Sequence, residues 1–321
     1  MYYNIKYDPK VILSIAIATR NRPRLLENLV NIIISEGSVD DIEIVIVDDA
    51  STKENWILVE KLLLLSNNIK IYRNEQKIGL TANWNKVISF ASGKWISFMC
   101  DDDMFKSGAL DRIRSIISRE TRPCLILQNS NIEENFEWLS PGTDAAIKVA
   151  LPPASGQIWH RDLTDKLGFY DERIKYCPDA EFWPRLAFHY PVLLVKEYFI
   201  IPYQHDTNMM WEHLDSSDFL EQIKLSIEIS ATWILGQDCN DTKKLGEFVD
   251  VGIWETLRTT LNNTFLVKGR MRNFMLYLLQ FIKYSIKIKR KSLTILTILK
   301  LPILRLKDLL RPLIKKKIRI K

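Results

Sequence analysis

Residues 11–51 read VILSIAIATRNRPRLLENLVNIIISEGSVDDIEIVIVDDAS, and this stretch decides the fold. Its first eight residues, 11–18, are a continuous apolar run rich in isoleucine, which predicts a strand buried on both faces. Pro23 then opens an amphipathic segment, as proline does in the first turn of a helix. A second apolar run, IEIVIV, follows. Strand, helix and strand in this order predict a βαβ unit with parallel strands.

The same alternation continues to about residue 103. A helix over NWILVEKLLLL, a strand over IKIYRN, a helix over LTANWNKVISFAS and a strand over KWISFMC follow one another. This order predicts an α/β fold with a mostly parallel, Rossmann-like sheet and helices on both faces, in which ligands bind beyond the carboxyl ends of the strands. Polar clusters stand at three of those ends: Thr19 to Arg22, Asp48 and Asp49, and Asp101 to Asp103. We therefore expect three strand ends to point at one crevice.

The composition argues against several classes of protein. The chain has 321 residues, 47% of them hydrophobic, which is enough for a sizeable core. Its four cysteines form no CxxC pair, so neither a zinc site nor a disulfide framework is indicated. The dinucleotide fingerprint GxGxxG and the P-loop are both absent. Residues 1–10, a short leader, lack a signal-peptide pattern, and no apolar run is long enough to span a membrane, so we expect a cytoplasmic protein.

The three consecutive carboxylates of Asp101, Asp102 and Asp103 repel one another unless a cation or a hydrogen-bonding ligand lies among them. Oxygen ligands suit Mg²⁺ or Mn²⁺, which bind through one or two carboxylates plus substrate phosphates. The pattern therefore indicates a divalent cation site. A solvated acidic turn or helix N-terminus would show the same residues, because Asp is favoured in both places.

Three stretches, SIAIATRNRP, IVIVDDAS and NEQKIGLTANWNKVISFASGKWISFMCDDD, resemble glycosyltransferase family 2 in their order and spacing. A later block, GFYDERIKYCPDAEFWPRLAFHYPV, is similar to the family's stretch in which an FDE-like turn precedes an acidic pair and a W-x-R-L helix. The resemblance covers about residues 10–208. It implies a GT-A domain over residues 11–213. It also implies transfer of a sugar from a nucleotide diphosphate-sugar with inversion at the anomeric carbon, and the expected donor is a UDP-sugar.

The resemblance also implies roles for individual residues of the donor site. Those that it assigns to the nucleotide and its sugar are Thr19, Arg20, Asp48, Asp49, Lys77, Gly79, Asn83 and Asp101. Asp102 or Asp103 would hold the metal, Mn²⁺ or Mg²⁺, against the phosphates, and His205 would supply a further metal or phosphate contact. Many relatives carry Asp where this chain has Cys100, so the register of the three aspartates stays open.

Several of these assignments have an ordinary structural alternative. Asp49 and Ser51 could instead cap the next helix, since both residue types are favoured N-caps. Gly79 could be a turn glycine, and Asn83 a residue of a helix surface. A lone histidine such as His205 is more often structural than a ligand.

The resemblance implies that Asp179 is the general base. Inverting transfer needs a carboxylate opposite the leaving group to accept the proton of the acceptor hydroxyl. The family's acidic pair is here Pro178 followed by Asp179, so only its second member is retained. Glu181 and Trp183 would then face the acceptor, the indole offering a flat apolar surface to a sugar ring. Packing of Trp183 in the core is the alternative.

The C-terminal third departs from the α/β pattern. Residues 214–285 read as a helical extension and residues 286–321 as a basic amphipathic tail. Residues 283–321 hold 14 Lys/Arg and one acidic residue, so their net charge is +13 and that of the remaining chain −7. Basic residues interleaved with leucine and isoleucine are typical of a segment that lies among lipid headgroups. A solvated terminus is a second interpretation, and nucleic-acid binding is disfavoured because the body is acidic and the tail lacks regularly placed aromatics.

These patterns together predict a metal-dependent inverting glycosyltransferase on the inner face of the cell membrane, with a glycan or a lipid-linked acceptor, in bacterial surface-polysaccharide synthesis. A nucleotidyltransferase is the rival enzyme, although its usual glycine-rich activating loop near the N-terminus is missing. A catalytically inactive binding or scaffold protein with the same fold is the other alternative. Retention of Asp101 to Asp103 together with Asp179 argues against it.

Overall fold

The computed structural model describes residues 7–36, 40–129, 132–149, 154–201 and 217–235. The chain divides into two units, Met1–Asp206 and Thr207–Lys321, which are treated separately. The described part of the first unit contains an eight-stranded sheet with the strand order β3-β2-β1-β4-β8-β6-β9-β7. Four of its seven strand pairs are parallel and three are antiparallel. The prediction of a mostly parallel sheet is confirmed.

The parallel half of the sheet is the part that positions the polar strand ends. Its strands are β3 (Ile69–Arg73), β2 (Ile42–Asp48), β1 (Leu13–Thr19) and β4 (Trp95–Cys100). Their register places Thr19 beside Asp48 and Asp48 beside Arg73, so the carboxyl ends of three strands form one row. Every residue of β2 is buried, as the apolar run predicts for a strand covered on both faces.

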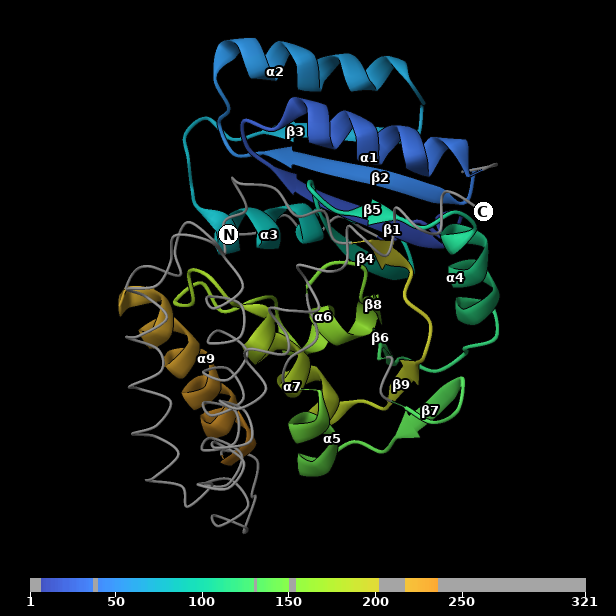
Figure 1. Cartoon of the computed structure of the whole chain (residues 1–321), viewed down its shortest axis with the longest axis vertical. Helices are drawn as coiled ribbons and strands as arrows, with labels where there is room; N and C mark the ends of the chain where they lie inside the picture. Colours follow the sequence, from blue (N-terminus) through green and yellow to red (C-terminus); the bar gives the residue numbers. More distant parts are fainter. Residues whose placement is uncertain (1–6, 37–39, 130–131, 150–153, 202–216, 236–321) are drawn as a thin grey trace, which may run out of the picture. The chain divides into compact units, whose positions relative to one another are not determined.

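Helices cover both faces of this sheet (Figure 1). On one face, α1 (Pro23–Ser35), α2 (Lys53–Glu60), the 3₁₀ turn η1 (Lys61–Leu64) and α4 (Ala109–Ile117) pack against β1, β2 and β4. On the other face, α3 (Leu80–Ser89), α5 (Thr143–Lys148), α6 (Arg161–Leu167) and α7 (Asp179–His189) bury an apolar and aromatic cluster. The sheet thus has two cores, as an α/β fold requires.

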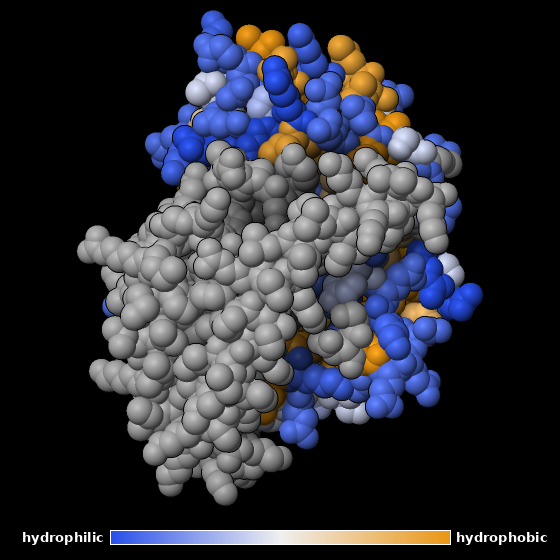
Figure 2. Space-filling model, viewed as in Figure 1, coloured by the Kyte–Doolittle hydropathy of each residue, from blue (hydrophilic) through white to orange (hydrophobic). Residues whose placement is uncertain are grey.

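The α2 side of the molecule keeps several apolar side chains at its surface. Only Val59 and Leu62 of α2 and η1 are buried. Figure 2 shows hydrophobic residues among the hydrophilic ones over this side. The large exposed apolar residues of this segment are Ile57, Leu58, Leu63, Leu64 and Leu65.

The second half of the sheet is less regular than the first. The apolar runs CLILQN and PVLLVK form the strands β6 (Leu125–Gln128) and β9 (Val192–Val195). Between β4 and β6 lies the antiparallel β8 (Ile158–His160), and β7 (Phe136–Leu139) pairs with β9. A separate antiparallel pair joins β5 (Met104–Phe105) to β10 (Ile200–Ile201).

A buried carboxylate ties together the amino ends of the parallel strands. Glu43 on β2 accepts hydrogen bonds from Ser14 Oγ on β1 (2.5 Å) and from Ser92 Oγ just before β4 (2.8 Å). Lys70 Nζ on β3 donates to the same carboxylate at 2.5 Å. Burial alone would raise the pKa of Glu43, but the hydrogen bonds from Lys70, Ser14 and Ser92 lower it below its usual value. This cluster fixes the mutual register of four strands at the edge opposite the polar strand ends.

In the second unit the structure describes one helix, α9 (Ser217–Leu235). It lies within the helical extension that the sequence predicts over residues 214–285. Among the described helices none is both long and apolar enough to cross a membrane. The rest of the predicted extension, 214–285, and the basic tail, 286–321, lie outside the described residues.

Candidate donor and catalytic site

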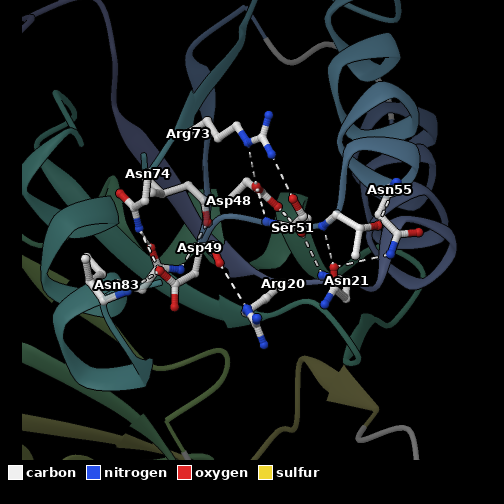
Figure 3. A network of polar contacts seen from close by, with 12 residues as sticks. Arg20, Asn21, Asp48, Asp49, Ser51, Asn55, Arg73, Asn74 and Asn83 are labelled. Carbon is white, nitrogen blue, oxygen red and sulfur yellow. Dashed lines mark hydrogen bonds and ion pairs between the residues drawn. The ribbon is translucent and has the colours of Figure 1, made fainter. Parts of the chain in front are cut away.

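Two adjacent turns at the carboxyl ends of β1 and β2 adopt backbone conformations that are costly for residues with a side chain. Asn21 has φ +56° and Ala50 has φ +52°. Ser51 Oγ accepts a hydrogen bond from Asn21 N (2.8 Å), and Asn21 Oδ1 accepts one from Thr52 N (2.9 Å) (Figure 3). These bonds fasten the two turns to each other. Such positive φ angles persist when the surroundings enforce them, often at functional sites.

The carboxylate of Asp49 organises the loop between β3 and α3. Its Oδ1 accepts from Asn74 Nδ2 (3.0 Å) and Ile78 N (2.8 Å), and its Oδ2 from Gly79 N (3.1 Å). Gly79 has φ +95°, and open space surrounds the position of a Cβ there. Since a carboxylate offers about four acceptor positions, one remains on Asp49 for a ligand N–H. Asp49 is therefore both the candidate nucleobase contact and the residue that holds the loop between β3 and α3.

Asp48, which the sequence offers as the alternative nucleobase contact, needs a correction. It is wholly buried. Its carboxylate accepts hydrogen bonds from the backbone N–H (2.9 Å) and the hydroxyl of Ser51, and Arg73 Nε lies 3.6 Å away. Asp48 therefore holds the turn after β2 and does not face a ligand. The cap of α2 is Thr52, whose Oγ1 accepts from Asn55 N, so the alternative that Asp49 and Ser51 cap this helix is wrong.

The remaining donor-site candidates differ in exposure. Asn83 is buried, donating to Val47 O (3.1 Å) and accepting from Asn74 Nδ2 (2.9 Å) (Figure 3), so the alternative that it is a helix-surface residue is wrong. Arg20 is exposed and donates to Asp49 O at 3.1 Å. Lys77 is exposed on the loop before Gly79. His205 lies outside the described residues.

Asp101 is the buried member of the acidic triplet. It is 5% exposed, and its carboxylate accepts from Thr19 Oγ1 (2.7 Å) and from Arg22 Nη1 (3.2 Å). Burial raises its pKa to about 6; Arg22 opposes the rise and Asp102 adds to it. Arg22 also donates to Asp102 Oδ2 at 2.9 Å. One guanidinium thus partly neutralises two of the three carboxylates.

Asp102 and Asp103 lie together with Cys100 in a group that could hold a metal ion. One ligand atom from each of the three residues lies within 4.8 Å of the others. Two carboxylates suit Mg²⁺ or Mn²⁺, whereas sulfur suits softer ions. Burial, and then the charges of Asp103 and Asp102, raise the pKa of the Cys100 thiol well above its usual value. The donor set that fits at neutral pH is therefore the pair of carboxylates, with Cys100 as a protonated thiol beside them.

Asp179 begins helix α7 and is partly buried. Backbone N–H groups of Asp179 itself, Ala180 and Ala154 lie near its carboxylate and favour the ionised form. Burial outweighs their effect and raises the pKa of Asp179 to about 6. A carboxylate with this pKa is ionised at neutral pH and is still basic enough to accept a proton.

A short link joins Asp179 to the end of β4. The N–H of Ala154 lies near the Asp179 carboxylate, and the next residue, Ser155, accepts a hydrogen bond from Cys100 N through its Oγ (2.8 Å). Gly156 follows, with N donating to Phe98 O at 2.8 Å. Three consecutive residues therefore tie the candidate base to the strand that carries the acidic triplet.

Gly156 is required in that link. Its φ is +76°, and a Cβ added there would lie 2.1 Å from Ile200 Cγ1 and 2.9 Å from Gln128 Nε2. Residues with a side chain rarely adopt this φ, and the space is already filled. The link consequently depends on the absence of a side chain at this position.

We correct the expectation that Glu181 and Trp183 face an acceptor. Both side chains are wholly buried. Glu181 accepts from Arg185 Nε (2.6 Å) and Nη2 (3.0 Å), and Trp183 packs against Trp159 and Phe182 with ring centroids 5.7 and 4.9 Å apart. Trp183 is thus a core residue, the alternative that the sequence leaves open, because α7 must present an apolar face to the sheet.

Sequence reasoning assigns no individual role to Arg22, Asn74 or Arg185, although each is central to a polar network. The sequence nevertheless marks the segments in which these three residues lie. Arg22 belongs to the polar cluster after the first strand, Asn74 follows the third strand directly, and Arg185 lies in the W-x-R-L block. What the sequence could not provide is the partner of each side chain.

Comparison with known proteins adds a family and a set of structural neighbours. The model of the glycosyl transferase family 2 domain matches residues 14–176. The GalNAc(5)-diNAcBac-PP-undecaprenol beta-1,3-glucosyltransferase of Campylobacter jejuni is 28% identical over 185 residues, which cover 54% of this chain and 59% of that enzyme. Glycosyltransferase GlyG of Streptococcus pneumoniae is 24% identical over 140 residues, 43% of this chain and 46% of the relative. The matches thus span about half the length of these curated relatives.

Solved structures share the fold. TarS residues 1–349 from S. aureus, in complex with UDP-GlcNAc, superposes with a TM-score of 0.62 at 20% identity, covering 85% of this chain and 81% of that one. The mannosyltransferase PcManGT from Pyrobaculum calidifontis, in complex with GDP-Man and Mn²⁺, gives a TM-score of 0.54 at 13% identity, covering 96% and 91%. These neighbours show that the fold is that of GT-A glycosyltransferases, as expected from the sequence.

Proposed function

The chain belongs to glycosyl transferase family 2, and from this premise we propose that it is a metal-dependent, inverting glycosyltransferase. It moves a sugar from a nucleotide diphosphate-sugar to a hydroxyl of a glycan or lipid-linked acceptor. The observation that carries this proposal is the link of residues 154–156, which joins the candidate base Asp179 to the strand end that bears Asp101 to Asp103. A base and a diphosphate-binding cluster close to each other are what inverting transfer needs.

In the proposed reaction, Asp49 accepts a hydrogen bond from the nucleobase, and Thr19, Arg20, Lys77 and Gly79 border the nucleotide. A divalent cation held by Asp102 and Asp103 would act as a Lewis acid on the leaving diphosphate. Asp101 contacts the ribose. Support comes from the burial of three of these side chains. Thr19, Asp49 and Asp101 are each 5% exposed or less and are already held in position by hydrogen bonds.

Asp179 accepts the proton of the acceptor hydroxyl as that oxygen attacks the anomeric carbon from the side opposite the diphosphate. The nearby backbone N–H groups favour the ionised form of this carboxylate, which is the form that can accept a proton. General-base catalysis of this kind contributes about 10²- to 10⁴-fold in rate. Inversion follows because attack and departure lie on opposite faces of the sugar.

For the donor and acceptor we propose a UDP-sugar and a growing glycan on a lipid carrier. The complex of TarS contains UDP-GlcNAc, and the name of the C. jejuni relative includes an undecaprenol-linked glycan. The +13 charge of residues 283–321 supports a location on an anionic membrane surface, at the inner face of a bacterial cell membrane. In this proposal residues 11–213 carry out catalysis, residues 214–285 form a helical extension and residues 286–321 bind the membrane. His205 supplies a further metal or phosphate contact.

The experiment that tests this function is a thermal unfolding panel with UDP, GDP, dTDP and CMP, each with and without Mn²⁺. Ligands that bind only the folded state raise its melting temperature by mass action. We expect one nucleotide to stabilise the wild type in the presence of Mn²⁺, and Asp102→Asn to abolish that stabilisation. Glu60→Gln, an exposed carboxylate at the far end of α2, serves as the matched control and should respond like the wild type. If no nucleotide stabilises the wild type, the proposed function is wrong.

A further inference from the structure

Tyr170 carries a hydroxyl for which the described part of the fold supplies no partner. The residue is 3% exposed, and its hydroxyl oxygen is closed off from solvent and makes no hydrogen bond within the described residues. Its ring packs against Phe182, Trp84 and Phe98, with centroids 4.1, 5.4 and 6.3 Å away. A phenylalanine would make the same ring contacts without burying an unpaired polar group. Packing therefore does not account for the hydroxyl.

The backbone of Tyr170 is held firmly on both sides. The side-chain amide of Asn85 on α3 accepts a hydrogen bond from Tyr170 N (2.9 Å) and donates one to Tyr170 O (2.8 Å). Arg185 on α7 donates to the carbonyl of the preceding residue, Phe169, at 2.6 Å. Two helices thus hold the backbone at this residue, and the ring contacts hold its side chain.

The ring of Tyr170 packs against both elements of the proposed chemistry. Its neighbour Phe98 lies on β4, two residues before Cys100, and its neighbour Phe182 lies on α7, three residues after Asp179. Burial raises the pKa of Tyr170 well above its usual value, and the charge of Asp179 adds to the rise. Asp179 is the candidate base, and Cys100 directly precedes the acidic triplet. The hydroxyl also stays protonated at working pH, so it can both donate and accept.

We propose that the Tyr170 hydroxyl hydrogen-bonds a hydroxyl group of the transferred sugar and contributes to the choice of donor. The inference rests on the proposed function, in which the sugar lies between the diphosphate and the acceptor. A phenol offers one donor and two acceptor positions, which match the mixed character of sugar hydroxyls. Because the oxygen is closed off in the unliganded protein, the contact requires a small shift of neighbouring side chains, such as rotamer changes on binding commonly provide.

The test compares Tyr170→Phe with the wild type in calorimetric binding of two kinds of probe in the presence of Mn²⁺. The first kind is a nucleoside diphosphate, UDP or GDP, and the second is its sugar nucleotide, UDP-GlcNAc, UDP-glucose or GDP-mannose. We expect the variant to bind the diphosphate like the wild type and the matching sugar nucleotide about 2- to 10-fold more weakly, the usual range for one lost hydrogen bond. The melting temperature of the unliganded variant should be unchanged or higher, since an unpaired buried hydroxyl is removed.

Tyr190→Phe is the matched control, because Tyr190 follows the last residue of α7, at the opposite end of that helix from Asp179. It should leave both affinities unchanged. Equal affinity of the wild type and Tyr170→Phe for the sugar nucleotide would overturn the inference, as would an equal loss for diphosphate and sugar nucleotide. If neither kind of probe binds the wild type, the proposed function itself fails and the inference falls with it.

Discussion

At the scale of single residues, the account depends most on Asp179. Replacing it by Asn keeps the size of the side chain but removes the group that accepts the proton. We expect Asp179→Asn to lose about 10²- to 10⁴-fold in kcat, with the affinity for the nucleoside diphosphate close to that of the wild type. Steady-state kinetics and calorimetric binding measure the two quantities. A variant that keeps wild-type kcat would assign the base to another residue.

The pH dependence of the reaction follows from the same carboxylate. Burial raises the pKa of Asp179 to about 6, and only the ionised form can accept a proton. We therefore expect kcat, measured at saturating donor and Mn²⁺, to fall as the pH drops through about 6. Asp101 also has a pKa of about 6, but a cation bound beside it would lower that pKa and remove it from this range. A kcat that is constant between pH 5 and 8 would contradict the assignment of Asp179.

At the scale of elements, α7 is held by a buried ion pair that also secures the turn before it. Arg185 pairs with Glu181 and donates to the carbonyls of Leu167 and Phe169, each at 2.6 Å. Arg185→Leu would leave the buried charge of Glu181 unpaired, which costs about 3–5 kcal/mol of unfolding free energy. Urea denaturation at pH 7 measures this loss.

The control for that prediction is the exposed pair of the same region. Arg173 is 68% exposed and lies 2.5 Å from Asp171. Exposed ion pairs contribute about 0–1 kcal/mol, so Arg173→Leu should change the unfolding free energy little. Equal effects of the two substitutions would mean that the Glu181–Arg185 pair is not the element that holds α7.

The amino ends of the parallel strands provide a second prediction at this scale. The pKa of Glu43 is lowered, because the hydrogen bonds from Lys70, Ser14 and Ser92 outweigh its burial. A lowered pKa stabilises the fold above the usual value of 4.5, and this contribution is lost as the pH falls through the pKa of the folded state. We expect Glu43→Gln to cost about 2–3 kcal/mol at pH 7, with the difference from the wild type narrowing below pH 4.5. Urea denaturation across this range is the measurement, and the exposed Glu60→Gln should show no such trend.

At the scale of the whole molecule, charge is distributed unevenly, with +13 in residues 283–321 and −7 in the rest. Each basic residue near an anionic leaflet contributes about 1 kcal/mol of attraction. We expect the full chain to sediment with vesicles that contain phosphatidylglycerol, but not with purely zwitterionic ones, and a chain truncated after residue 285 to remain in the supernatant. Sedimentation of the truncated chain with the anionic vesicles would refute the role of the tail.

The sequence predicts the parallel half of this molecule well, because β1, β2 and β4 are almost wholly buried and read as largely apolar runs. Strand β8 was not predicted, since three residues paired antiparallel between β4 and β6 leave no local pattern. Within the site, the strand ends could be located, but the direction of each side chain could not. Asp48 and Asp49 are neighbours in sequence, yet one holds its own turn and the other faces the loop before α3. Contacts between segments distant in sequence made these distinctions.

The most direct test of the central claim is to follow the products of the donor by ¹H NMR. The wild type is incubated with Mn²⁺ and the sugar nucleotide whose diphosphate stabilises it, with water as a slow acceptor. The account predicts release of the nucleoside diphosphate together with a sugar of inverted anomeric configuration. Release by Asp179→Asn, which still binds the donor, should be about 10²- to 10⁴-fold slower. Retention of the anomeric configuration would contradict the inverting mechanism. Pyrophosphate among the products would instead identify a nucleotidyltransferase. A donor that binds but stays unchanged would indicate an inactive scaffold protein.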